Sequence, residues 1–188
     1  FTGAGVTVTD AGSNQANITI PGGGGGGGTA QNQQVALVVD QKATTIDGGT
    51  STAGWQERTL NTEVYDENEL VTITAGDDGF NLVAGEYLIE WSAPCFRGNR
   101  HQTALSTSTA AAGIVAVGNT AFNDGSGDEA QTFSSGSWRV DNNVAQTYHI
   151  LHNIQTARAD DGLGLASDSG QAEIYTQVKI TNLAGVNV

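Results

Sequence analysis

Apolar and polar residues alternate with a period of two along most of this chain. Successive side chains of a β-strand point to opposite faces, so such alternation is typical of a strand with one face in a core. Runs of this kind cover residues 35–39, 70–74, 87–95, 102–106, 113–118, 131–140, 146–154 and 173–180, and stretches rich in Gly, Asp and Asn separate them. About eight strands at this spacing predict an all-β fold, a β-sandwich of the jelly-roll kind.

Two of these runs predict which side chains face the core. In the run at 87–95, the apolar face carries Tyr87, Ile89, Trp91, Ala93 and Cys95. In the last run, one face carries Ile174, Thr176, Val178 and Ile180, opposite Tyr175, Gln177 and Lys179. A large aromatic side chain on that otherwise polar face, Tyr175, indicates a second buried surface, such as a subunit contact.

The first 33 residues predict a separate organisation. Residues 5–10 and 16–20 alternate on both sides of a turn, which is a hairpin signature. Two short strands are not stable alone in water, so this hairpin is expected to pair with copies of itself or to dock elsewhere. The glycine run Gly22–Gly28 is either a flexible tether or an ordered rod. We therefore expect a β-hairpin shaft segment at 1–20, a Gly-rich linker at 21–33 and the jelly-roll domain at 34–188.

Composition supports the β-fold and restricts the partners. The chain has 26 Gly residues and no Met. Its polar character comes mainly from Ser, Thr, Asn, Gln and Gly, which suit strands and turns better than helices. The formal net charge of −13 repels nucleic acid and anionic membranes, and no apolar run is long enough to span a bilayer. Cys95 is the sole cysteine, so no intrachain disulfide is possible and a small buried hydrophobe is expected. The start at Phe1 favours a fragment of a longer polypeptide.

Short motifs occur in a fixed order between residues 35 and 183. They are Asp40-Gln41-Lys42, Asp47-Gly48-Gly49, Trp55, Arg58, Leu60-Asn61-Thr62, Phe80, Ala84-Gly85-Glu86-Tyr87, Ser92-Ala93-Pro94, Asn99-Arg100-His101-Gln102 and Glu173-Ile174-Tyr175-Thr176. In order and spacing this set resembles the C1q/TNF-like jelly-roll heads of phage tail fibres and of surface proteins of large viruses. The hairpin and the glycine run resemble fibre-shaft segments of phage tail proteins. Leu163 departs from the aromatic residue expected there, and the loop at 119–130 has a composition of its own.

The resemblance implies a non-enzymatic homotrimeric knob on a viral or phage fibre. In such a knob each jelly roll lies with its inner face against its neighbours. The implied location is the virion surface, on a tail or capsid fibre. The implied partners are other virion proteins and a host surface receptor, with a glycan among the candidates. Two alternatives stay open: a purely structural trimerisation cap or capsid decoration without a receptor, and a glycan depolymerase.

Patterns for catalysis or metal binding are weak. His149 and His152 are three apart in an expected strand, so they point to opposite faces and cannot chelate one metal ion together. The sequence has no Gly-x-Ser-x-Gly elbow, and we expect no catalytic residue and no cofactor. The acidic stretch at 124–129 lacks the spacing of an EF-hand loop, which favours a solvated turn and leaves calcium as the alternative.

Two sets of polar residues are candidate sites. Loops on a rigid scaffold commonly carry binding, so receptor contacts are expected at Asn123, Asp124, Asp128, Arg158, Asp160, Asp161 and Asp168. The second set lies inside the ordered motifs: Asp40, Lys42, Arg58, Arg100, His101 and Tyr175. We interpret this set as a trimer-interface or buried polar network in which arginine pairs with carboxylate, with direct receptor contact as the alternative.

Overall fold

The structure is a computed structural model that describes residues 7–10, 16–19, 33–74, 76, 78–123 and 130–183. The chain divides into two compact units, Phe1–Gln31 and Asn32–Val188. In the first unit, β1 (Thr7–Asp10) and β2 (Ala16–Thr19) pair antiparallel, with Thr7 opposite Thr19, which confirms the hairpin. The glycine run lies outside the described residues, so the linker at 21–33 stays a prediction.

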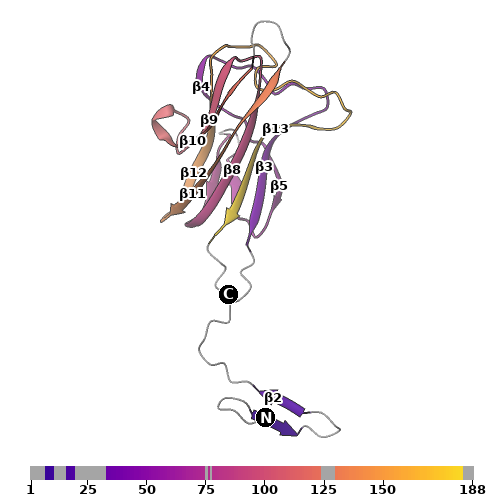
Figure 1. Cartoon of the computed structure of the whole chain (residues 1–188), viewed down its shortest axis with the longest axis vertical. Helices are drawn as coiled ribbons and strands as arrows, with labels where there is room; N and C mark the ends of the chain where they lie inside the picture. The colour runs from indigo at the N-terminus through magenta and orange to yellow at the C-terminus, as the bar shows by residue number, and fades with distance from the viewer. Residues whose placement is uncertain are drawn as a thin grey trace. The chain divides into compact units, whose positions relative to one another are not determined.

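The second unit is a sandwich of two antiparallel sheets (Figure 1). One sheet has the order β11 (Gln131–Asn142), β8 (Gly85–Phe96), β13 (Glu173–Asn182), β3 (Val35–Lys42) and β5 (Thr62–Asp66). The other has the order β10 (Ile114–Phe122), β9 (Arg100–Ser106), β12 (Gln146–Ile154), β7 (Phe80–Leu82) and β6 (Val71–Ile73), with β4 (Gly54–Glu57) also paired to β12. A short 3₁₀ turn, η1 (Ala111–Gly113), precedes β10. The all-β jelly-roll prediction is confirmed.

All the runs predicted from alternation are strands, and three strands were missed. The missed strands are β4, β5 and β7, which have three to five residues each. The sequence of β4, Gly-Trp-Gln-Glu, shows no alternation, and the central residues of β5 are exposed. Such short or exposed strands are defined by the partner strand beside them rather than by their own pattern.

The core lies between the two sheets. The face of β8 that was predicted to be buried is buried. Its side chains are each no more than 3% exposed: Tyr87, Ile89, Trp91, Ala93 and Cys95. Neighbouring strands extend it in register, since Val178 of β13 pairs with Trp91 on one side and with Val38 on the other. From the other sheet, Phe80 and Tyr148 bring ring centroids to 5.9 Å.

Trp91 crosses the core and connects the two sheets. Its indole Nε1–H donates a hydrogen bond to Thr103 Oγ1 of β9 at 2.9 Å. The indole lies over Gly136, its cross-strand partner in β11. A Cβ atom at Gly136 would lie 2.0 Å from Trp91 Cζ2, so only glycine lets the ring occupy this place.

An irregularity in β13 changes the prediction for the last run. The register with β3 shifts between Ile174 and Gln177, so the simple alternation fails there. Ile174 was predicted to face the core, but its side chain is 40% exposed. Tyr175 is only 3% exposed. The second buried surface at Tyr175 is formed by the chain itself: the Tyr175 hydroxyl donates to Ile46 O at 2.8 Å, and Gly164 lies against the Tyr175 ring.

Arg58, directly after β4, is fully buried and joins three segments. Its Nε–H donates to Thr176 Oγ1 of β13 at 2.7 Å. Its two terminal nitrogens donate to Pro94 O of β8 at 3.3 Å and to Leu163 O in the loop between β12 and β13 at 2.8 Å. This guanidinium therefore ties that loop to the five-stranded sheet.

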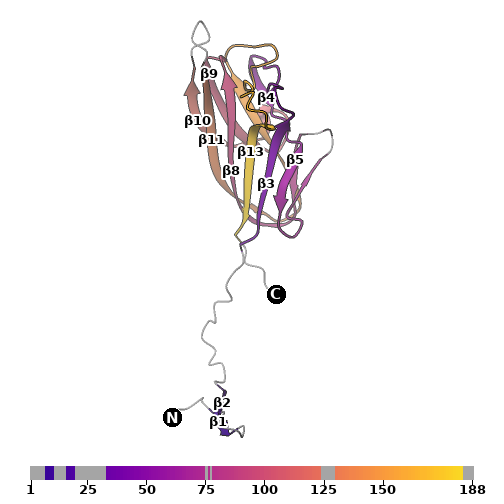
Figure 2. The same ribbon diagram turned by 90° about the vertical axis from the view of Figure 1, so that its right-hand side faces the viewer.

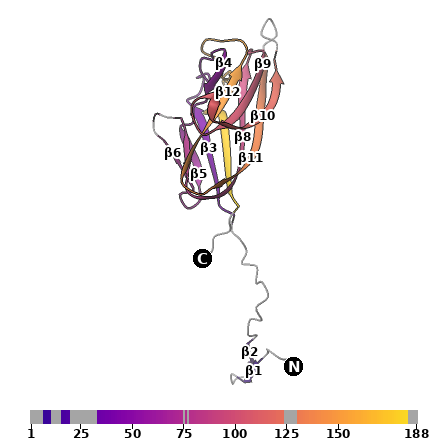
Figure 3. The ribbon, with the colours of Figure 1, turned by 90° about the vertical axis from the view of Figure 1, so that its left-hand side faces the viewer.

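The chain enters and leaves the sandwich at one end. The Asn182 N–H at the end of β13 donates to Gln34 O just before β3, at 2.9 Å. The loops at 43–53, 97–99 and 155–172 lie at the opposite end, which we call the distal end (Figure 2). Figure 3 shows β4, β9, β10 and β12 reaching the distal end together.

We predict that Gly136→Val destabilises the domain by about 2 kcal/mol or more, because the new side chain overlaps the Trp91 indole in a closed core. Urea unfolding monitored by tryptophan fluorescence measures the loss. The matched control is Ser137→Val, the next residue of the same strand, which is exposed and should change stability by less than about 0.5 kcal/mol. Equal effects of the two substitutions would contradict the proposed packing.

Candidate functional site

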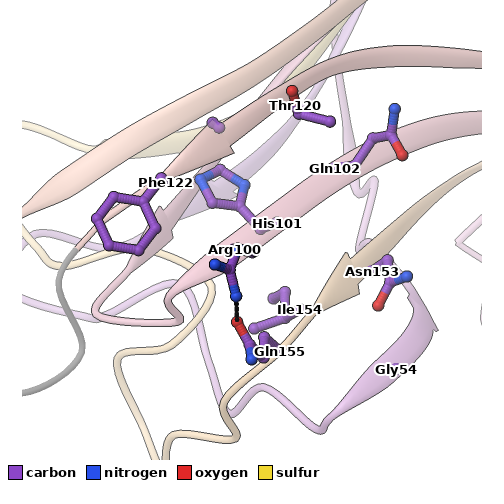
Figure 4. Close-up of a pocket in the computed structure, with 10 residues that line it drawn as sticks. Gly54, Arg100, His101, Gln102, Thr120, Phe122, Asn153, Ile154 and Gln155 are labelled. Atoms are coloured by element: carbon purple, nitrogen blue, oxygen red, sulfur yellow. Dashed lines mark hydrogen bonds between the residues drawn. The ribbon is translucent and has the colours of Figure 1, made fainter.

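An open groove of about 620 Å³ lies on the outer face of the six-stranded sheet, near its distal end. It is lined by residues of four strands and the residue after β12: Gly54, Arg100, His101, Gln102, Thr120, Ala121, Phe122, Asn153, Ile154 and Gln155. Figure 4 shows the side chains of these strands around it. The groove combines one cationic, one aromatic and several amide side chains, which is the mixed lining of a small-ligand site.

Register pairing determines which side chains line this groove. On β9, Arg100 and Gln102 point outward and alternate with the buried His101 and Thr103. On β10, Phe122 lies opposite Arg100, and its side chain is 60% exposed. The exposed Phe122 ring and the Arg100 guanidinium are therefore cross-strand neighbours at one end of the groove.

The polar contacts inside the groove are few. Arg100 Nη1 donates to Gln155 Oε1 at a long distance of 3.4 Å (Figure 4). Gln102 Nε2 donates to Gly118 O at 2.9 Å, which fixes that amide against β10. No acidic residue lines the groove among the described residues, although the whole chain has a formal net charge of −13. The part of the groove lining that the structure describes is thus poor in negative charge.

A buried histidine pair lies directly behind the groove. His101 Nδ1 and His152 Nε2 are 2.9 Å apart, and His101 Nε2 is 2.8 Å from Thr132 Oγ1. Burial, together with the nearby charge of Arg58, lowers the pKa of His101 to about 4. Burial, Arg58 and His101 lower the pKa of His152 well below its ordinary value. Both rings are therefore neutral at pH 7.

Asn123 extends this buried network and is not available for a receptor. It is 2% exposed, and its Nδ2 donates to Cys95 O at 2.8 Å and to Thr132 Oγ1 at 3.2 Å. The Asn99 N–H donates to Asn123 Oδ1 at 2.7 Å. Asn123 holds the end of β10 against β8, so its assignment as a receptor-contact residue is wrong in this structure.

The other predicted loop residues have different environments. Arg158 Nε lies 3.7 Å from Asp161 Oδ1, and both side chains are partly exposed. Asp160 and Asp168 are exposed and have positive φ angles of 65° and 52°. Receptor contact at these four residues stays a prediction. Asp124 and Asp128 lie outside the described residues.

The predicted polar set forms a network only in part. Asp40 is buried and pairs with Lys42, whose Nζ lies 3.0 Å from Asp40 Oδ1. Burial raises the pKa of the Asp40 carboxyl, and Lys42 opposes that shift. Burial lowers the pKa of Arg58 to about 10, so it stays protonated at pH 7. Its direct partners are a hydroxyl and two carbonyl oxygens, not the predicted carboxylate, and Arg100 is exposed in the groove instead of joining the network.

The prediction that His149 and His152 face opposite sides is confirmed. His149 Nδ1 contacts Glu57 Oε1, whereas His152 lies behind the groove beside His101. Cys95 is buried, as predicted. Within the described ranges, no three His, Cys, Asp or Glu side chains come together as metal ligands, and no helix has the length and hydropathy to cross a membrane.

Sequence reasoning missed most of the groove residues. Gln102, Phe122, Asn153 and Gln155 come from three strands or their ends, and only pairing brings them together. One signal could have found part of the site: Phe122 lies just past the end of the predicted run at 113–118, after the polar Asn119 and Thr120 and after Ala121. An exposed aromatic at a strand end is a feature of interaction surfaces.

We expect the stability of the domain to fall as the pH decreases from about 6.5 to about 4. Above pH 6.5, His101 and His152 are neutral in both the folded and the unfolded chain. Below it the unfolded chain takes up protons that His101 cannot bind until the pH reaches about 4. Ring C–H signals of His101 and His152, assigned by His→Gln variants, should not titrate in NMR between pH 8 and pH 5. A midpoint near 6.5 for either ring would contradict this account.

No protein-family model and no curated protein matches this chain. Among solved structures, it is similar to the globular domain of the zebrafish complement 1qA protein, with 18% identity and a TM-score of 0.51 over 81% of this chain and 98% of that chain. It is also similar to murine APRIL at pH 5.0, with 12% identity and a TM-score of 0.51 over 80% of this chain and 99% of that one. Identities this low are informative about the fold alone, and the fold of this chain is the C1q/TNF-like jelly roll.

Proposed function

We propose that this chain is the homotrimeric, non-enzymatic head of a viral or phage fibre, which lies on the virion surface and attaches the particle to a host cell. The observation that carries the trimer is a set of large apolar side chains exposed at both lateral edges of the sandwich. Monomeric proteins rarely expose so many large apolar residues in neighbouring positions, and such surfaces mark subunit contacts.

The first exposed edge is formed by β10 and β11. Val117 of β10 is 58% exposed, and Trp138 and Phe133 of β11 are 48% and 50% exposed. The Ser134 hydroxyl donates to Asn119 O at 2.7 Å and so holds the two strands together across the open side of the sandwich. This edge offers aromatic and aliphatic surface on a rigid support.

The second exposed edge is β5, on the other side of the sandwich. There Val64 and Tyr65 are 51% and 45% exposed. The two apolar surfaces are different parts of the chain, so a contact between the first edge of one subunit and the second edge of the next is heterologous. Repeated contacts of this kind form a closed ring when the rotations between subunits add up to a full turn. A ring of three is the arrangement that the C1q/TNF-like resemblance implies.

The position of the chain ends supports a head at the tip of a fibre. The chain enters and leaves the sandwich at the same end, where the Asn182 N–H donates to Gln34 O. The groove lies near the opposite, distal end. A fibre attached through residues before Gln34 would leave the distal loops and the groove free for a host surface. The hairpin of β1 and β2, with its likeness to shaft segments, supports a fibre of this kind.

The groove supports binding rather than cleavage. Glycoside hydrolysis ordinarily needs two carboxyl groups on either side of the scissile bond. The described residues that line this groove include no Asp and no Glu. Its chemistry suits recognition of a ligand, which three copies in one trimer would strengthen through avidity.

We expect the purified chain to have three times the mass of one chain in analytical ultracentrifugation at micromolar concentration. The double variant Val117→Asp/Trp138→Asp should shift toward the monomer mass, because two charges would be buried without partners at the contact. The control Val144→Asp changes a residue that is 71% exposed in the turn between β11 and β12, and it should stay trimeric. A monomeric wild-type chain would refute the trimer, and a double variant that keeps the trimer mass would refute the contact at β10 and β11.

The trimer should also bind the host cells of the particle and compete with intact particles for adsorption. A purely structural cap would assemble with the same mass and would neither bind cells nor compete. Adsorption therefore separates the attachment function from the alternative of a structural cap.

A further inference from the structure

Among the described residues, Arg100 has no carboxylate partner, in contrast to Arg139 and Arg158. Arg139 pairs with Glu86 at 2.7 Å, and Arg158 lies near Asp161. Among the described residues, the Arg100 guanidinium has a single long hydrogen bond, to the neutral Gln155 side chain. In a chain with 20 acidic and 7 basic residues, a cation without an acidic neighbour leaves its charge available for a ligand.

The rest of the groove selects the class of that ligand. Gln102, Asn153 and Gln155 each carry an amide with two donors and an acceptor, which suits hydroxyl groups that both donate and accept. The exposed Phe122 ring offers an apolar surface beside them for the C–H face of a sugar ring. The planar fork of Arg100 matches a carboxylate in bidentate geometry.

We propose that this groove binds a saccharide carrying a carboxylate, with the acid group on Arg100, the ring against Phe122 and the hydroxyl groups on the amides of β9 and β12. This inference rests on the proposed attachment function and names the receptor chemistry for it. The described lining of the groove carries one cationic side chain, Arg100, and the whole chain has a net charge of −13. This suits a ligand with one carboxylate per site rather than a densely charged polyanion.

The groove is built to keep this arrangement in place. Arg100 and Gln102 flank His101, whose ring is fixed by His152 and Thr132 behind the sheet. Gln102 is held to Gly118 O, and Phe122 precedes Asn123, which is anchored to Cys95 O. Ligand-contacting residues on strands, supported by a buried network, are better ordered than residues on loops.

The test uses isothermal titration calorimetry and saturation-transfer NMR on the full chain. The probes are oligosaccharides that end in sialic acid or in a hexuronic acid, each paired with its carboxyl-reduced neutral counterpart. We expect at least one acidic probe to bind, and its neutral counterpart to bind about tenfold or more weakly, because a charge-assisted hydrogen-bond pair is lost.

Substitutions locate the binding. Arg100→Gln should weaken the acidic probe about tenfold or more and leave binding of the neutral probe unchanged. Phe122→Ser should weaken both probes. The control Arg139→Gln removes the same charge from an exposed arginine outside the groove and should have no effect. Circular dichroism and ultracentrifugation confirm that each variant keeps its fold and mass.

The outcomes distinguish this inference from the proposed function. If no acidic probe binds at millimolar concentration, or if Arg100→Gln binds as well as wild type, the groove assignment is overturned. Adsorption to host cells that neither Arg100→Gln nor soluble probe reduces overturns the groove and leaves attachment standing. Saccharide binding by a trimer that does not adsorb to any host cell supports the groove and refutes attachment.

Discussion

The buried guanidinium of Arg58 is the contact on which the distal end of this domain depends. A fully buried cation is costly to desolvate, and this one is offset only when Thr176, Pro94 and Leu163 all accept hydrogen bonds from it. These acceptors belong to β13, β8 and the loop between β12 and β13, so the two strands and the loop must be in place together. Because Arg58 directly follows β4, the same contact holds one strand of the groove to the five-stranded sheet.

From this anchor the order spreads to the groove. The loop held by Arg58 lies over the top of the five-stranded sheet, where Phe96 N donates to Gly162 O and Gly164 packs on Tyr175. Beneath the groove, Asn123, Thr132, His101 and His152 form a continuous chain of buried polar contacts. The outward residues of β9 and β10 alternate with members of this chain, so the buried network and the ligand-facing side chains are two faces of the same strands. Polar groups of this kind are stabilising only when they are satisfied together.

Much of the fold could be predicted from the sequence, and less of the site. Alternation located the long strands and the buried face of β8, because a period of two follows directly from strand geometry. It failed at the irregularity near Ile174 and for the short strand β4, where pairing and not local pattern decides the structure. Motif order pointed to Arg58 as a buried polar residue but not to its carbonyl partners, which lie 36 and 105 residues away in sequence. It placed Arg100 in that network as well, because a sequence does not show which face of a strand has a loop over it and which is open.

Amide hydrogen exchange of Arg58 variants tests this account most directly. In Arg58→Met the carbonyl oxygens of Pro94 and Leu163 lose their donors, so exchange at Gly162–Gly164 and at Arg58's neighbours in β4 should speed up by about tenfold or more, while the centre of β8 around Ile89 stays protected. The matched variant Arg139→Met, at an exposed arginine, should leave both regions unchanged. Exchange at residues 162–164 that is as slow in Arg58→Met as in the wild-type chain would contradict the central role given to this guanidinium.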